Sequence, residues 1–332
     1  MLMHLIKRYA SFARDFFIYL FNYGNFIVIN YLDPVATRKS LAVGYMLFDG
    51  EEIVLDSIIK VRPVAERIYI VFQTTDNWGL PHPRGINEIR NFWSEVKRIG
   101  LVDEIVEYCP SRAPATDYRS HQEVHDVAKR NLALELAKKD NIDLYMCIDN
   151  DEIYLTKQLR YMKFTMSRKR NREKVAAVQH LQYFKDNKHI KVPIEQEYVA
   201  TIFWISEDSQ FVYDYPLSIP IDPARRPNIN KIRRFRRFEI EMHHMSYVRD
   251  DIRIKLKSSA MRNEFHQINE KISELWDAFP SVDRVLWASN WVTTKKVRKV
   301  IPLPFFSSGK VKSWIAQGKL PRHDPLFDIE IH

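Results

Sequence analysis

Glycine is scarce in this chain, with only 8 glycines among 332 residues. A phosphate-binding loop of the glycine-rich type needs several glycines close together, so that kind of nucleotide site is disfavoured. Cysteine is rarer still, and the two that are present, Cys109 and Cys147, each lie in a strand-like apolar run. We interpret both as reduced core residues of a cytosolic protein, since nothing in their positions supports a disulfide.

Targeting and repeat signals are also lacking. There is no internal repeat or low-complexity segment, and no small-residue cleavage site follows a basic start, which disfavours a signal peptide. The apolar stretch 16–32 nearly reaches transmembrane length, but Asn22, Gly24, Asn25 and Asn30 interrupt it. Apolar side chains from Leu2 to Leu20 instead recur at helical spacing. Two interpretations remain open: an amphipathic helix on a membrane surface, or a helix packed on the main domain or on a partner subunit of a homo-oligomer.

What is present is enough for a sizeable core, because 45% of the residues are hydrophobic. Lysine and arginine number 51 against 42 aspartates and glutamates, which leaves a net charge of +9. This excess favours an anionic partner, whether a nucleotide, a nucleic acid or an acidic membrane surface. Charge alone does not choose among the three.

Strands and helices alternate from residue 39 onward. We expect strands over 41–48, 67–72 and 104–108, helices over 50–59, 87–99 and 122–139, and then a buried strand from residue 144. This alternation predicts an α/β fold with a mostly parallel sheet flanked by helices. Further strands are expected over 175–184, 198–205 and 238–248, and helices over 249–261 and 267–279. We divide the chain into a helical segment 1–38, a main domain 39–262, and a helical, basic and aromatic extension 263–332.

The sequence LYMCIDNDEIY, residues 144–154, changes abruptly from apolar to acidic. Its three carboxylates, Asp149, Asp151 and Glu152, are costly to bury unpaired, so they should lie where the strand leaves the core. Ligands bind at the carboxyl ends of strands in open α/β sheets. In an extended chain Asp149 and Asp151 would project to the same side, and two such oxygen donors suit Mn²⁺ or Mg²⁺. A solvated acidic loop is the alternative.

The stretch from about Lys39 to Met261 resembles a GT-A-type glycosyltransferase, a Rossmann-like fold, related to the family-2 group. The resemblance rests on motifs in a fixed order: a strand–Gly-Glu-Glu–helix opening at 42–55, a strand ending at Asp76, a helix with Lys129-Arg130-Asn131, the DxD motif at 149–151, and HHMSYVRDDIRIKLKSSAMRN at 243–263. Residues 1–38 and about 70 C-terminal residues fall outside it.

The resemblance implies a metal-dependent glycosyltransferase of the hexosyltransferase type. It would move a sugar, with inversion, from a nucleotide-diphosphate sugar, which we expect to be a UDP-sugar, to a glycan or lipid-linked acceptor of a surface polysaccharide or glycoconjugate. Asp76 and Arg130 would contact the nucleotide, and Asp149 its ribose and the metal side. The divalent cation (Mn²⁺ or Mg²⁺) would be held by Asp149, Asp151 and His244, with His243 as the alternative to His244. Arg249 and Lys255 would neutralise the leaving diphosphate.

The resemblance also implies a catalytic base. Glu207 and Asp208 follow an expected strand, as does the acidic pair that supplies the base in the family, and Asp208 is preferred. Asp214 and Asp222 are the alternatives. The base takes the proton from the acceptor hydroxyl, as inversion requires.

A basic nucleic-acid- or membrane-binding protein without catalysis is the competing interpretation. It would use Lys231–Arg237 with its interleaved aromatic side chains. It leaves the acidic cluster after Ile148 without a role, so nucleic acid is the less favoured partner. An inactive relative kept as an assembly partner is a third interpretation. We expect a cytoplasmic location, peripheral to the inner face of a membrane, where anionic lipids attract lysine and arginine.

Overall fold

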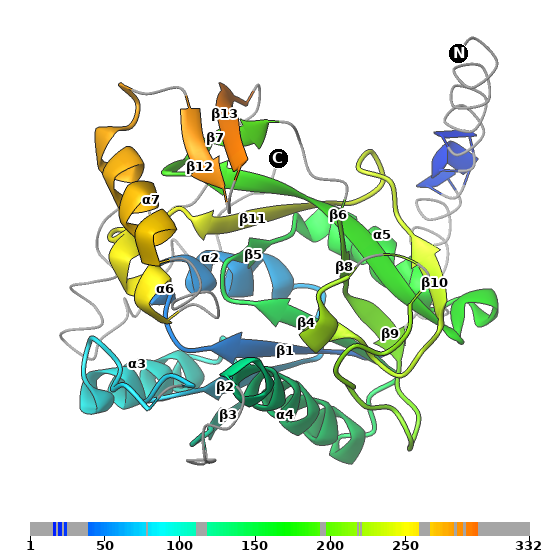
Figure 1. The fold of residues 1–332 in the computed structure, drawn as a ribbon. Coiled ribbons are helices and arrows are strands. Elements are labelled where there is room, and N and C mark those ends of the chain that lie inside the picture. Colours follow the sequence, from blue (N-terminus) through cyan, green and yellow to red (C-terminus); the bar gives the residue numbers. More distant parts are fainter. Residues whose placement is uncertain are drawn as a thin grey trace, which may run out of the picture.

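The computed structural model describes residues 16–24 and 39–297, apart from 18, 22, 78, 111–117, 193–196, 218, 220, 259–265, 282–283 and 288–289. Within these residues the chain forms an α/β fold of two sheets with helices around and between them (Figure 1). The expected fold class, a parallel-rich sheet flanked by helices, is confirmed. The Lys-rich end of the C-terminal extension, from residue 298, lies outside the described residues.

The first sheet has the strand order β3-β2-β1-β4-β9, and its first four strands are parallel. Strand β1 is buried over its whole length because helices cover both faces of the sheet. Helix α4 packs against one face through Ala133, Leu134 and Ala137, while α2, α3 and α5 contribute to the core on the other face. The bounds of these elements are β1 (Leu41–Leu47), α2 (Glu51–Val61), β2 (Arg67–Phe72), α3 (Ile86–Arg98), β3 (Glu104–Glu107), α4 (Tyr118–Lys139), β4 (Leu144–Asp149), α5 (Thr156–Met166) and β9 (Ile202–Trp204).

The second sheet is built around the long strand β6, which pairs in parallel with β11 and β10 and antiparallel with β7 and β8. Its edge strand β5 pairs antiparallel with β11, so that His244 lies opposite Glu152. The elements are β5 (Glu152–Ile153), η1 (Lys169–Asn171), β6 (Lys174–Phe184), β7 (Asp186–Val192), β8 (Tyr198–Ala200), η2 (Pro223–Arg225), β10 (Lys231–Arg234) and β11 (Glu241–Tyr247). Only two residues, Asn150 and Asp151, separate β4 in the first sheet from β5 in the second.

The C-terminal extension is helical only in part. Helices α6 (Ile252–Ser258) and α7 (His266–Ala278) agree with the expectation. A hairpin of β12 (Arg284–Trp287) and β13 (Asn290–Lys296) follows and extends the second sheet by pairing with β7. The sequence predicted no strand here, although the β-branched and aromatic residues of RVLW and NWVTTKK suit one.

Helical residues are also described within 16–24, where the sequence left two interpretations open. Tyr19 and Tyr23 pack against Tyr161 of α5, with ring centroids 5.4 and 5.9 Å apart. Within the described part of the chain, no helix has the length and apolar character needed to cross a membrane. The segment is thus attached to the main domain by its aromatic side chains.

Candidate active site

The acidic residues form a turn at the carboxyl edge of the parallel strands. Strand β4 ends at Asp149, Asn150 and Asp151 make the turn, and β5 begins at Glu152. The buried side chain of Asn150 donates a hydrogen bond to the backbone carbonyl of Asp49, just beyond the end of β1. The turn is therefore fixed to the neighbouring strand of the first sheet.

Two arginines hold Asp149. Its Oδ1 lies 3.0 Å from Nη1 of Arg130, on α4, and its Oδ2 lies 3.3 Å from Nη1 of Arg225, on η2. Burial on its own would raise the pKa of this carboxyl, but the two guanidinium groups outweigh burial and lower the pKa of Asp149 to about 2. Arg130 was predicted to contact the nucleotide; in the structure it is a buried partner of Asp149, and the nucleotide contact stays a prediction.

Arg225 also binds Glu152, the third carboxylate of the acidic cluster, and Arg225 was not singled out in the sequence. Its guanidinium is 2% exposed; it forms an ion pair with Glu152 and donates hydrogen bonds to the carbonyls of Cys147, at 2.5 Å, and Ala200, at 3.1 Å. Burial raises the pKa of Glu152, against the opposing charge of Arg225. Arg225 therefore connects η2 to β4, β5 and β8. The sequence did not predict this residue of the site.

Asp151 has a different set of partners. Its Oδ2 lies 3.0 Å from Nη2 of Arg249 and 3.3 Å from Nζ of Lys255, and its Oδ1 lies 3.4 Å from Nε2 of His244. Burial opposes ionisation, but Lys255, His244 and Arg249 outweigh it, so the pKa of Asp151 lies well below its usual range. The three residues that the resemblance placed around the metal and diphosphate do gather at this carboxylate.

Gly50 makes room for that arrangement. A Cβ at this position would lie 2.1 Å from Nη1 of Arg249 and 2.4 Å from Nδ2 of Asn150, and the backbone φ of 86° favours glycine. Glycine at position 50 is therefore required for the close approach of Arg249 to the end of β1.

The expectation that Asp149 and Asp151 project to the same side assumed an extended chain. The structure has a turn at this point, so Asp149 faces Arg130 and Arg225 while Asp151 faces β11 and α6. Among the described residues, no group of three or more histidine, cysteine, aspartate or glutamate side chains could hold a metal ion. The three predicted ligands do not form one such group.

Asp151 and His244 are the two residues that would hold a divalent cation, at the Asp151 oxygen that does not pair with Arg249 and Lys255. Oδ1 of Asp151 and Nε2 of His244 are 3.4 Å apart. Carboxylate oxygen and imidazole nitrogen are donors that Mn²⁺ accepts, and an ion held by few protein ligands completes its shell with water and substrate phosphates. This pair would hold the ion.

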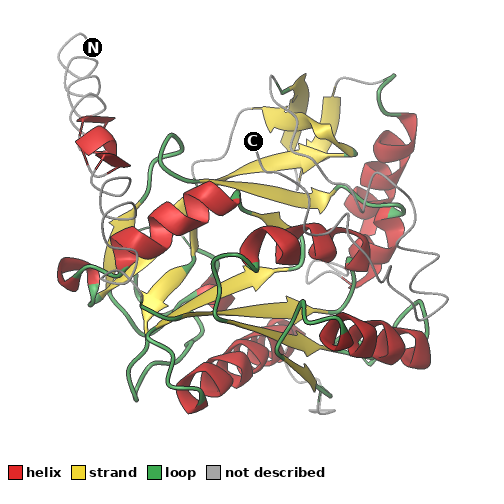
Figure 2. Cartoon of the chain, turned by 180° about the vertical axis from the view of Figure 1, so that it is seen from behind, coloured by secondary structure: helices red, strands yellow, loops and turns green. Residues whose placement is uncertain are grey.

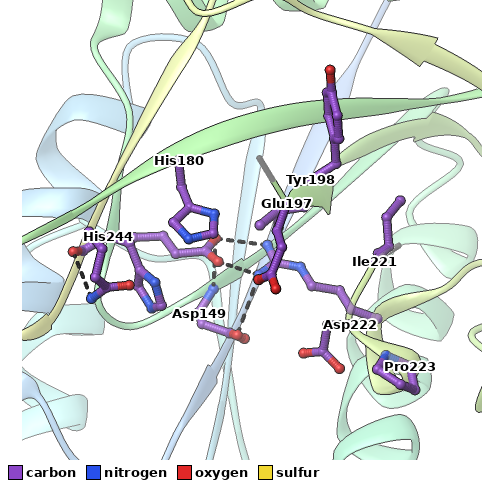
Figure 3. Close-up of a pocket in the computed structure, with 12 residues that line it drawn as sticks. Asp149, His180, Glu197, Tyr198, Ile221, Asp222, Pro223 and His244 are labelled. Carbon is purple, nitrogen blue, oxygen red and sulfur yellow. Dashed lines mark hydrogen bonds and ion pairs between the residues drawn. The ribbon is translucent and has the colours of Figure 1, made fainter. Parts of the chain in front are cut away.

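A pocket of about 440 Å³ opens beside the turn. In Figure 3, His180 and His244 lie on one side of Asp149, and Ile221, Asp222 and Pro223 lie on the other. The complete lining consists of Asp149, Glu152, His180, Gln182, Glu197, Tyr198, Val199, Ile221, Asp222, Pro223, Arg225 and His244. Four of these residues are carboxylates and one is an arginine, so the wall is acidic.

The expected base, Asp208, and its neighbour Glu207 are not at this site. Strand β9 runs antiparallel to β4, with Trp204 opposite Leu144, so residues after β9 lie at the edge where β4 begins. Both side chains are exposed there, and Asp208 accepts a hydrogen bond from Ser206 at 2.6 Å. The assignment of a catalytic role to this pair is therefore corrected. Of the alternatives, Asp214 is exposed and paired with Arg226, whereas Asp222 lines the pocket.

Asp76 is also absent from the pocket wall. It is 3% exposed, and its Oδ1 accepts a hydrogen bond from the backbone N–H of Leu80 at 2.8 Å. Its backbone also pairs with Leu80 and Gly79. These bonds assign it a role in closing the turn 76–80 after β2, in place of the predicted nucleotide contact.

Two buried histidines of the second sheet lead to a prediction about pH. Burial lowers the pKa of both imidazoles, His180 and His243, to about 4. The charge of His244 contributes to the lowered pKa of His180, and the charge of Lys60 does the same for His243. In the unfolded chain these imidazoles have the ordinary pKa of about 6.5, so they take up protons below that pH while the buried imidazoles stay neutral. Their contribution to stability is therefore complete above about pH 6.5 and is lost as the pH falls toward 4. We expect each histidine to cost roughly 1–2 kcal/mol of unfolding free energy at about pH 5.

Urea unfolding of the protein and of the variants His180→Gln and His243→Gln at neutral and mildly acidic pH measures this effect. Each substitution should flatten the dependence of unfolding free energy on pH. An identical slope in all three proteins would contradict the assignment.

No protein-family model matches the chain, and no curated protein matches it. Among solved structures, the crystal structure of residues 1–349 of S. aureus TarS is similar. The alignment has 10% sequence identity and a TM-score of 0.28, and it covers 42% of this chain and 35% of the TarS chain. This chain thus spans about a third of that one. Such a distant likeness carries no argument about activity.

Proposed function

We propose that the protein is a glycosyltransferase of the GT-A type that transfers a sugar from a nucleotide-diphosphate sugar, a UDP-sugar being the expected donor, to a glycan or lipid-linked acceptor. One observation carries the proposal: an acidic turn at the carboxyl edge of parallel strands meets Arg249, Lys255 and His244 beside a pocket that four carboxylates line. Ligands of open α/β sheets bind at this edge. The proposal also agrees with the motif order along the sequence.

The charge of the pocket supports a polyhydroxylated substrate with a cation beside it. Carboxylates such as Asp149, Glu197 and Asp222 accept hydrogen bonds from sugar hydroxyl groups. A diphosphate next to four carboxylates would be repelled unless positive charge came with it. A divalent cation on Asp151 and His244 would supply that charge and would stabilise the diphosphate as it leaves.

The protein's own cations would act on the same leaving group. As the sugar–phosphate bond breaks, negative charge accumulates on the diphosphate, and fixed cations stabilise that charge more in the transition state than in the ground state. Arg249 is buried and Lys255 is half-buried, and both are held by Asp151. Their positions are fixed before the substrate arrives, so little reorganisation is needed during reaction.

Asp222 is the residue we propose as the base in place of Asp208. Its Oδ1 accepts a hydrogen bond from the backbone N–H of Ala224 at 2.9 Å, which orients the carboxylate at the start of η2. The side chain lines the pocket and is exposed to it, as contact with an acceptor hydroxyl requires. A carboxylate that takes this proton during direct displacement leads to inversion at the sugar carbon.

Thermal unfolding in the presence of candidate donors tests the proposal. We expect a UDP-sugar with Mn²⁺ to raise Tm, since a ligand at about 100 times its Kd adds roughly 2.7 kcal/mol to stability. Substituting Asp151→Asn should remove this Mn²⁺-dependent shift, and Asp208→Asn, the same change at the opposite edge of the sheet, should retain it. If no nucleotide-diphosphate sugar shifts Tm and none is consumed in the presence of Mn²⁺, the proposal is wrong.

A further inference from the structure

Large apolar side chains are exposed together on the helical residues 16–24. Phe17 is 69% exposed, Phe21 is 71% exposed and Leu20 is 46% exposed. Scattered apolar residues are normal on a protein surface, but adjacent exposed groups on one element mark a binding surface. Tyr19 and Tyr23, four residues apart, face α5, so the other three side chains are directed away from the main domain.

The segment that this helical stretch contacts carries exposed cations. Phe16 and Tyr19 pack against Phe238, each with ring centroids 5.6 Å apart. Phe238 ends the basic segment that contains β10. Strand β10 runs beside the start of β6, directly after η1, with Lys231 opposite Lys174 and paired with Glu173. Both views place residues 16–24 and β10 at the same end of the molecule (Figures 1 and 2).

The charge of this end is strongly one-sided. Segments 168–174 and 231–239 each contain five lysines or arginines and one glutamate. The exposed cations are Lys169, Arg170, Arg172, Lys231, Arg234 and Arg236. We name these six cations with Phe17, Leu20 and Phe21 the basic-aromatic face. Arg234 lies 5.9 Å from the ring of Tyr198, which lines the pocket, so the face continues toward the pocket.

We infer that the basic-aromatic face binds an anionic lipid membrane. Exposed phenylalanine and leucine side chains insert at the boundary between headgroups and acyl chains, and neighbouring lysines and arginines contact lipid phosphates. Nucleic acid is anionic as well, but its binding uses aromatic rings stacked on bases, and Leu20 has no ring to stack. The combination of aliphatic and aromatic side chains with cations favours lipid. This inference does not depend on sugar transfer.

Sedimentation of the full-length protein with vesicles tests the inference. We expect binding to vesicles of phosphatidylcholine with phosphatidylglycerol, weaker binding to phosphatidylcholine alone, and release as salt increases. The triple variant Lys169→Gln/Arg170→Gln/Arg172→Gln should lower the partition coefficient of the protein between vesicles and buffer. Each cation contributes about fivefold, so the loss of three should lower it about a hundredfold. The double variant Phe17→Gln/Phe21→Gln should lower it at least about tenfold, because it removes two inserting side chains.

The matched control is Lys97→Gln/Arg98→Gln/Lys139→Gln, which removes the same net charge from exposed positions on α3 and α4. It should bind vesicles like the unchanged protein. Equal losses in the control and the basic triple variant would overturn the inference, because only net charge would then matter. Full binding by the Phe17/Phe21 variant, or displacement from vesicles by nucleic acid at a lower concentration than that of the lipid, would also overturn it.

Discussion

Substitution of Asp222 by asparagine is expected to lower kcat for sugar transfer by roughly 10²–10⁴-fold, the range that general-base catalysis contributes. Asparagine keeps an oxygen that can accept the hydrogen bond from Ala224, so η2 should remain in place. KM for the donor should change little, because the residue acts on the acceptor's proton. Steady-state rates with donor and acceptor, and the anomeric configuration of the product by NMR, provide the measurement.

Asp208→Asn is the matched control for that experiment. Asp208 was the base expected from the sequence, yet it is exposed at the edge of the sheet where β4 begins. Transfer rates should be unchanged in this variant. If Asp208→Asn loses activity and Asp222→Asn keeps it, Asp208 is the catalytic base, as the sequence predicts, and Asp222 is not.

Substitution of Arg225 by methionine is expected to lower the unfolding free energy by about 3–5 kcal/mol, the usual cost of breaking a buried ion pair. Arg225 and Glu152 are 2% and 3% exposed as side chains, and Asp149 shares the same guanidinium. Methionine fills much of the space but leaves Glu152 with a buried negative charge and no guanidinium partner. Urea unfolding of the variant measures the change.

A double-mutant cycle separates charge from packing at this position. Adding Glu152→Gln to Arg225→Met removes the uncompensated charge, so the double variant should be more stable than the Arg225→Met single variant. Arg98→Met, which breaks the exposed pair with Glu95, serves as the control and should cost under about 1 kcal/mol. Additive effects in the cycle would show that Arg225 acts through packing alone.

Much of the first sheet could be predicted from the sequence because its signals are local. The apolar run of β4 predicts the strand, and the acidic residues that follow it in the sequence predict where the strand leaves the core. The resemblance implied that His244, Arg249 and Lys255 belong to the site, and these residues do lie at Asp151. The part of the site around Asp151 could therefore be predicted from the sequence.

The position of Arg225, the location of Asp208 and the turn at Asn150 could not be predicted from local sequence patterns. Arg225 belongs to an irregular, proline-rich segment with no periodicity, so nothing in the sequence indicates that it returns to β4. The error at Asp208 has a different cause: alternation of apolar residues predicts a strand but says nothing about its direction, and β9 reverses the sheet. The chain turn at Asn150 likewise cannot be deduced from an i, i+2 spacing, which holds only for extended backbone.

The passage from β4 to β5 through Asn150 and Asp151 has a consequence for how this protein can be divided. Arg130 and Asp149 come from the N-terminal part of the chain, which forms β1 to β4. His244 lies on β11, and Arg249 is the second residue after that strand. A fragment that ends after α5 would retain the acidic carboxylates and Arg130, but it would lose the four groups that act on Glu152 and Asp151, namely Arg225, His244, Arg249 and Lys255. Only a chain in which both sheets have formed can keep Asp151 charged in its buried position, so the site exists only when the two halves fold together.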